Sequence, residues 1–188
     1  MILTDREIKN SLAAGLIIID PVPPDDAFSS TTVDLTLDPI LRIFKELAPG
    51  LSASIDPGLP GYKAKDLLAA VTDSFVIPSS GFDLVPGKLV LGWTSERLEL
   101  PQRGRVAARV EGKSGLARVG LAIHCTAPII HSGFEGTIQL EIVNHGPMPI
   151  KLRPGIPICQ LCFEQTMGMP DNSYKGQFLG QTAAPNKA

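Results

Sequence analysis

The feature that most constrains the fold is a long succession of short, strand-like segments. Each segment is rich in β-branched or alternating apolar residues and is bounded by turn residues, and the 188-residue chain contains 18 glycines and 17 prolines. Regularly spaced short strands of this kind are typical of an all-β barrel or jelly roll. The expected strands are 16–20, 31–37, 40–44, 74–78, 88–100, 105–111, 120–126, 136–144, 148–152 and 156–164.

Helical patterns occur in two places. Residues 4–15 begin with Thr4 and carry Glu7 three positions later, which predicts a short amphipathic helix with a capping box. Residues 61–73 fit either a second helix or a loop insertion. A chain of this length and apolar content forms one domain by default, so we expect a single domain over residues 1–188.

Composition and charge exclude several classes of partner. No run of about 18 apolar residues is present, which argues against a transmembrane helix. The first ten residues carry charges where a signal peptide would be apolar, so we expect a cytoplasmic protein without a membrane partner. The net charge of −2 offers no basic surface for wrapping nucleic acid, whereas a small anion held by a few local cations remains compatible.

The segment Gly112-Lys113-Ser114 resembles the end of a nucleotide-binding P-loop. A P-loop needs a glycine five positions earlier, but Ala107 occupies that position within an apolar, β-branched run. Two glycines in the next six residues interrupt the helix that should follow, so we expect a loop. Its Lys113, Ser114 and Arg118 side chains are donors that suit an anion.

Cys159 and Cys162 form a C-x-x-C pair that could indicate a metal site. Zinc-dependent nucleobase deaminases combine P-C-x-x-C with an H-x-E triplet. Here Ile158 separates Pro157 from Cys159, and no H-x-E triplet occurs. We therefore expect buried free cysteines and no zinc.

Alternation along residues 136–144 places Thr137, Gln139 and Glu141 on one face of a strand and apolar residues on the other. A carboxylate in this setting is either paired structurally or acts as a catalytic acid or base, and the pattern leaves both interpretations open. His131 follows a strand and precedes a Gly-aromatic turn, a position typical of a solvated histidine.

Two further polar residues occur inside apolar strands. His124 is expected to be a hydrogen-bonded core residue, and Asp34 is expected to bond to a neighbouring loop.

In combination, these segments resemble the dCTP deaminase family, whose relatives include the trimeric dUTPases. The resemblance rests on EGKSGLARVGL, HCTAPIIHSGFEGTIQLEIVN, RPGIPICQLCFE and SYKGQ, and extends to LTDREIKNSLAAG and TTVDLTL near the N-terminus. It spans nearly the whole chain in the family's motif order. It implies a distorted jelly roll or β-barrel of the dUTPase-like type, with an N-terminal helix and strand over residues 1–20, assembled as a homotrimer with shared active sites.

The resemblance also implies an activity, the zinc-independent hydrolytic deamination of dCTP to dUTP and ammonia. Glu141 would be the general base, and Ser114 would support the attacking water or the developing charge. Arg118 and Lys113, with Gly115 in the same loop, would steady the phosphates. A Mg²⁺ ion would accompany the triphosphate, because hard oxygen ligands suit it.

The remaining nucleotide contacts implied by the resemblance come from three segments. The backbone of Thr126 and Ala127 would read the base, with His131 close to it, and Gln160 would contact a phosphate. The C-terminal residues 171–188 would form a mobile lid that carries the contact residues Tyr174, Lys175 and Gln177.

The chain departs from the family pattern at three positions. His131 stands where many members carry aspartate, and Ser173 stands where a lysine is usual. Ile129 replaces the arginine of deaminase-only members and matches members that also release pyrophosphate. The alternatives are therefore a bifunctional dCTP deaminase and dUTP pyrophosphatase, a dUTPase, or a nucleotide-binding regulator without catalysis.

Overall fold

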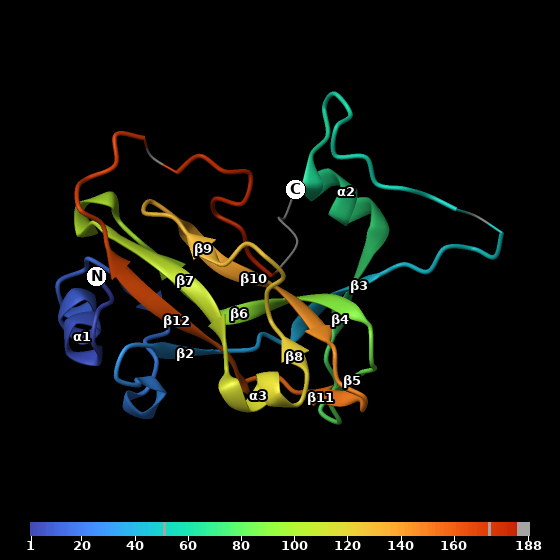
Figure 1. Ribbon diagram of the computed structural model, residues 1–188, viewed down its shortest axis with the longest axis horizontal. Helices are drawn as coiled ribbons and strands as arrows, with labels where there is room; N and C mark the ends of the chain where they lie inside the picture. The colour runs from blue at the N-terminus through green and yellow to red at the C-terminus, as the bar shows by residue number, and fades with distance from the viewer. Residues whose placement is uncertain (51, 173, 184–188) are drawn as a thin grey trace.

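The computed structural model describes residues 1–50, 52–172 and 174–183, and it is mainly β (Figure 1). The helices are α1 (Asp5–Ala13), α2 (Ala64–Val71) and α3 (Ser114–Arg118), with short 3-10 helices at Asp25–Ala27 and Gln102–Gly104. The strands are β1 (Ile18–Asp20), β2 (Val33–Thr36), β3 (Ile40–Phe44), β4 (Thr72–Val76), β5 (Phe82–Leu84), β6 (Leu89–Glu99), β7 (Val106–Gly112), β8 (Leu121–Ala122), β9 (Ile129–Ile130), β10 (Glu135–Asn144), β11 (Ile150–Leu152) and β12 (Pro157–Gln165).

These strands form two larger sheets and one two-stranded ribbon in the described part of the chain. One sheet has the order β4-β3-β6-β10-β8, with β1 also paired to β6, and the other has the order β2-β12-β7-β9. Strands β5 and β11 form the ribbon. Apolar side chains from both larger sheets, such as Leu35, Leu140 and Phe163, belong to one buried core. Two antiparallel sheets around one core match the jelly roll expected from the sequence.

Strand β10 follows the alternation predicted for it. Ile138, Leu140 and Ile142 are buried in the core, whereas Thr137 and Glu141 alternate with them on the half-exposed face. The predicted outward position of Glu141 is confirmed.

The N-terminal helix forms as predicted, but its capping box does not. Thr4 is the N-cap residue, yet its side chain makes no capping hydrogen bond. The Asp5 amide instead donates to the Ser30 carbonyl at 3.0 Å. A loop carbonyl thus satisfies an amide that a local cap would otherwise serve.

The segment after β7 differs from the expectation of a loop and a long strand. Residues 114–118 form the single turn of α3, in which the Ala117 amide donates to the Lys113 carbonyl at 2.9 Å. Gly120, with φ of +96°, ends the turn. Of the strand expected over 120–126, only Leu121–Ala122 pairs with β10, because the chain then bends away from the sheet.

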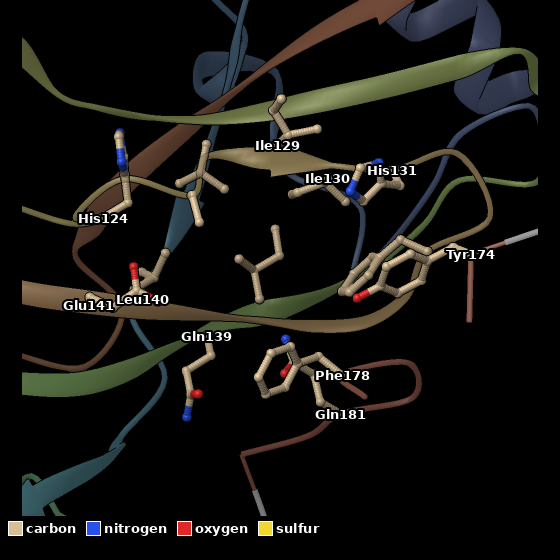
Figure 2. A pocket seen from close by; sticks show the side chains of 14 residues that line it. His124, Ile129, Ile130, His131, Gln139, Leu140, Glu141, Tyr174, Phe178 and Gln181 are labelled. Atoms are coloured by element: carbon tan, nitrogen blue, oxygen red, sulfur yellow. The ribbon is translucent and has the colours of Figure 1, made fainter. Parts of the chain in front are cut away.

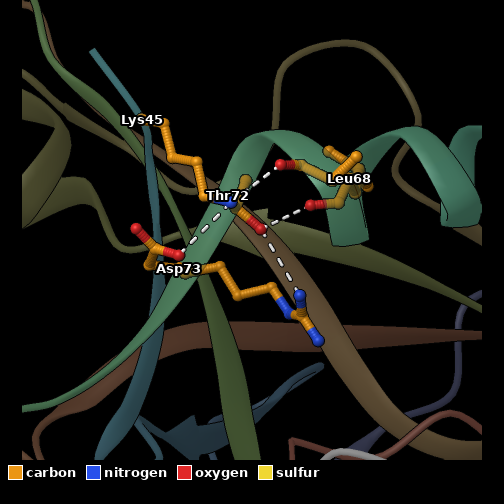
Figure 3. A network of polar contacts seen from close by, with 6 residues as sticks. Lys45, Leu68, Thr72 and Asp73 are labelled. Carbon is orange, nitrogen blue, oxygen red and sulfur yellow. Dashed lines mark hydrogen bonds and ion pairs between the residues drawn. The ribbon is translucent and has the colours of Figure 1, made fainter.

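Of the two interpretations left open for residues 61–73, the helix is the one observed: it is α2, between the connection that follows β3 and the start of β4. Figure 3 shows how Thr72 holds its end: the Thr72 hydroxyl donates to the Leu68 carbonyl at 2.6 Å, and Arg42 donates to the same hydroxyl at 3.4 Å. Lys45 and Asp73 form an ion pair at 3.5 Å beside it. These contacts attach α2 to the paired strands β3 and β4.

The expectation that Cys159 and Cys162 are buried free thiols is confirmed, as is a structural partner for Asp34. Cys159 and Cys162 are buried and free. Asp34 forms an ion pair with Lys113, so a structural partner explains this carboxylate. No helix in the described ranges is both long enough and apolar enough to cross a membrane.

Candidate active site

The outward carboxylate of β10 lies in a pocket of about 240 Å³ (Figure 2). Glu141 accepts a hydrogen bond from the Cys125 amide at 3.3 Å. Among the described residues it has no cationic partner. Other carboxylates on these sheets have a cationic partner. Glu164, for example, contacts Arg109 at 2.7 Å. A half-buried carboxylate without an ion pair is free to exchange a proton with a ligand.

The pocket walls combine apolar and polar side chains from both sheets and from the C-terminal tail. Its apolar lining includes Val110, Ile130, Phe134, Ile138, Leu140 and Phe178. Its polar lining comprises His124, His131, Gln139, Glu141, Tyr174 and Gln181. Figure 2 shows Glu141 and His124 toward one end and His131 with Tyr174 toward the other. A concave, partly apolar site with a few converging polar groups is the usual form of a small-molecule site.

His124 is not the hydrogen-bonded core residue that the sequence predicted. It is half-buried and lines the pocket, and its buried Nδ1 atom has no hydrogen-bond partner in the described structure. The apolar residues around His124 predicted a core strand, but β8 ends at Ala122 and His124 lies beyond the sheet. The unpartnered nitrogen is available to a ligand.

The C-terminal tail, residues 174–183, packs along the start of β10. The Thr137 amide donates to the Gln181 carbonyl at 3.0 Å, and the Gln181 side chain donates to the Thr137 carbonyl at 3.0 Å. The Gly180 amide donates to the Glu135 carbonyl at 2.7 Å. Tyr174 enters the pocket and stacks on His131. The tail thereby forms one wall of the pocket.

Other predicted tail and base contacts are dispersed. Ala127 lines the pocket, whereas Thr126 is exposed nearby on the same loop. Lys175 lines a separate pocket of about 350 Å³ on the other side of Tyr174, and Gln177 lines one beside α2. Ser173 lies outside the described residues.

The predicted phosphate loop does not line the Glu141 pocket. Ser114, Gly115 and Arg118 are exposed on α3, and Lys113 is engaged by Asp34. Figure 1 shows α3 at the lower edge of the molecule, far from β9 and the tail. One chain therefore presents the predicted residues as two separate groups.

Gln160 holds the backbone that leads into the predicted phosphate loop. Its side chain donates to the Gly112 carbonyl at 3.0 Å and accepts from the Thr32 hydroxyl at 3.0 Å. These bonds fix the backbone directly before Lys113. In this conformation Gln160 positions the loop.

Sequence reasoning missed several lining residues, namely Gln139, Phe178, Gln181 and His124 as a pocket residue. Gln139 could have been found, since it shares the outward face of β10 with Glu141. Phe178 and Gln181 carry no local signal, because only the docking of the tail brings them to the pocket. In the described ranges no group of three or more His, Cys, Asp or Glu residues is arranged to hold a metal ion.

Comparison with known proteins gives consistent matches. The sequence profile described as dCTP deaminase-like matches residues 2–166. A dCTP deaminase of Rhodospirillum rubrum is 41% identical over 175 residues, which cover 93% of this chain and 87% of the relative. A dCTP deaminase, dUMP-forming, of Methanosphaera stadtmanae is 37% identical over 187 residues, covering 96% and 90%.

A solved structure also matches. The crystal structure of 2'-deoxycytidine 5'-triphosphate deaminase from Agrobacterium tumefaciens superimposes with a TM-score of 0.65 and 25% identity over 86% of this chain. This chain spans 47% of that one. The match supports the two-sheet architecture described above.

Proposed function

The chain belongs to the dCTP deaminase family, and from this we propose that it hydrolyses dCTP to dUTP and ammonia. The observation that carries the proposal is Glu141, a carboxylate without a cationic partner in the described structure, held in a partly apolar pocket. Deamination at C4 of cytosine needs a group that accepts a proton from water and returns it, and a carboxylate of this kind can do both.

The reaction begins when Glu141 takes a proton from a water molecule whose oxygen attacks C4. Glu141 then passes this proton to the ring nitrogen beside C4, which gives a tetrahedral intermediate. When the bond between C4 and the exocyclic amino nitrogen breaks, the second proton of the water moves to that nitrogen, which leaves as ammonia. The cytosine amino group is replaced by the carbonyl oxygen of uracil, with no net change in redox state. The Cys125 amide donates a hydrogen bond to the Glu141 carboxylate at 3.3 Å and thereby orients this general base.

The phosphate-binding half of the site comes from the α3 segment of another copy of the chain. Arg118 and Lys113 contact the triphosphate, which enters as its Mg²⁺ complex, and Ser114 supports the attacking water. The support for this assignment is that these residues lie outside the Glu141 pocket of their own chain. In a homotrimer with shared sites, the Glu141 pocket of one chain and the α3 residues of another chain together form one complete active site.

The tail acts as the lid of the site. Tyr174 covers the base or sugar, and Lys175 and Gln177 turn toward the phosphates when nucleotide is bound. The contacts of Tyr174 and Gln181 with the pocket support this role. A closed lid excludes water from the hydrolytic site and strengthens its polar contacts.

The test is a deamination assay on purified protein with dCTP and Mg²⁺, following ammonia release. Glu141→Gln keeps the shape of the side chain and removes the base, so turnover should fall by ~10²–10⁴-fold. The matched control is Glu164→Gln, the same change at a carboxylate that pairs with Arg109 on the other sheet. Undiminished turnover by Glu141→Gln would contradict the proposal, and dCTP binding without any turnover by wild type would support the regulator alternative.

A second candidate function is pyrophosphate release coupled to deamination. The Methanosphaera stadtmanae relative is named dUMP-forming. The family resemblance implies that Ile129 corresponds to the apolar residue of members that also release pyrophosphate. In this step a water oxygen bonds to the α-phosphorus while the bond to pyrophosphate breaks. Pyrophosphate should then appear in step with ammonia, whereas accumulation of dUTP from dCTP would exclude the step.

A further inference from the structure

The rings of His131 and Tyr174 form a stacked pair that joins two distant segments. Their centroids lie 5.5 Å apart and their planes meet at 22°. Tyr174 also contacts Phe134 at 6.1 Å, in a tilted arrangement. His131 and Phe134 belong to the turn between β9 and β10, so the stack fixes the start of the tail to this turn.

The stacked pair is also a partition between two pockets. His131 and Tyr174 are the residues that the 240 Å³ pocket of Glu141 shares with the 350 Å³ pocket on the other side. The lining of the second pocket includes the polar side chains of Ser132 and Lys175. Separating the two rings would therefore open the end of the Glu141 pocket.

Two glycines leave room for the tail at this turn. At Gly133, with φ of +90°, an added Cβ would lie 3.3 Å from the Tyr174 amide nitrogen. At Gly136, with φ of +143°, it would lie 2.8 Å from the Gln181 carbonyl oxygen. The turn and the start of β10 thus fit the backbone of the tail closely, at both of its docking points.

We propose that His131 is a positioning residue that holds the tail closed by stacking on Tyr174. The expected effect on enzyme kinetics rests on the proposed function, whereas the docking of the tail onto the turn does not depend on catalysis. His131 acts through the flat face of its ring, so a phenyl ring can replace it and a methyl group cannot. This role differs from that of a base for pyrophosphate release, which would require the imidazole nitrogens.

Two probes report tail docking in the free protein. The Thr137 amide donates to the Gln181 carbonyl of the tail at 3.0 Å, and the Gly180 amide of the tail donates to the Glu135 carbonyl at 2.7 Å. Hydrogen exchange at these two amides therefore measures how often the tail leaves. Trp93 is the sole tryptophan of the chain, is 5% exposed, and lines a pocket with tail residues 177–182. Quenching of its fluorescence by acrylamide should rise when the tail undocks.

The experiment compares wild type with His131→Ala, His131→Phe and the control His145→Ala, which removes an exposed histidine outside the Glu141 pocket. His131→Ala should speed exchange at Thr137 and Gly180 by ~2–10-fold, the range expected for one aromatic pair, and increase Trp93 quenching. It should raise KM for dCTP by a similar ~2–10-fold with little change in kcat. His131→Phe should restore both properties, and His145→Ala should leave exchange at both amides unchanged.

Unchanged exchange and quenching in His131→Ala would overturn the proposal, as would equal losses of kcat in the alanine and phenylalanine variants. Exchange at β12 amides verifies that each variant is folded. If wild type does not deaminate dCTP but His131→Ala still releases the tail, the proposed function fails and the positioning role stands. If wild type is active and the tail of His131→Ala stays docked, only the positioning role fails.

Discussion

At the scale of single residues, the site depends on one carboxylate that has no cationic partner in the described structure, whereas other carboxylates of β10 and β6 do. Glu135 and Glu99 lie opposite each other across β10 and β6, and both contact Arg97. Glu141 lies opposite Leu91, an apolar residue that offers no charge. The alternation of β10 predicts that Glu141 points outward, but its freedom from ion pairs depends on which residue the register places opposite.

A residue-scale prediction concerns Gly92 in β6, which lies against the core. An added Cβ would be 2.6 Å from Ile142 Cδ1 and 3.2 Å from Leu37 Cδ1, both fully buried side chains. Gly92→Ala should therefore lower the free energy of unfolding by ~1–3 kcal/mol, as overpacking does in close-packed cores. Urea denaturation measures the change.

The matched control for this prediction is Gly168→Ala, where nothing lies within 4 Å of the added atom. It should change stability by no more than ~0.5 kcal/mol. Equal stability of the two variants would show that the core at Gly92 has room for a methyl group.

At the scale of elements, long strands with clear alternation were predicted well, and short elements were not. β6 and β10 match their expected ranges to within one residue at each end. α3 was missed because glycine argues against a helix, although one turn needs only the bond from the Ala117 amide to Lys113. β5 and β9 were missed because two or three residues carry no periodicity. The position of the tail is set by contacts with β10, which no local pattern encodes.

An element-scale prediction concerns the tail. Truncation after Asn172 removes Tyr174 and Gln181 but none of the strands of the two larger sheets, so the chain should remain folded. Its kcat/KM for dCTP should fall by at least ~10-fold, about 1.4 kcal/mol of transition-state stabilisation, because the lid is lost. Circular dichroism checks the fold and the deamination assay checks the rate. Full activity after truncation would refute the lid, and an unfolded product would show that the tail is structural.

At the scale of the whole molecule, the predicted catalytic groups lie on two separate surfaces. Glu141 lies in the pocket between β10, β9 and the tail, and Arg118 lies on α3, outside the lining of this pocket. A cyclic assembly can bring the α3 of one copy to the pocket of the next, because each interface joins two different surfaces. The sequence could suggest this only through family resemblance, since spacing along a chain does not reveal which surfaces meet between chains.

The whole-molecule prediction is that two inactive variants restore each other. Glu141→Gln and Arg118→Ala should each be nearly inactive alone. After equal amounts are denatured together and refolded, about one quarter of the interfaces should join an intact Glu141 to an intact Arg118, as random cyclic assembly requires. Deamination by the mixture measures this fraction, and mass determination by light scattering checks for a trimer. A mixture as inactive as its components would show that each chain holds its own complete site.

Strand β10 also has an evolutionary consequence. It carries the tail-docking residues Gly136 and Thr137 at its start and Glu141 near its end, and its pairing with β6 shifts between Thr137 and Gln139. One residue inserted or deleted between these points would turn Glu141 toward the core, because side chains alternate along a strand. The connection between β3 and α2 carries no such requirement. As descendants of this gene diverge, insertions and deletions should accumulate in that connection, while β10 keeps one length.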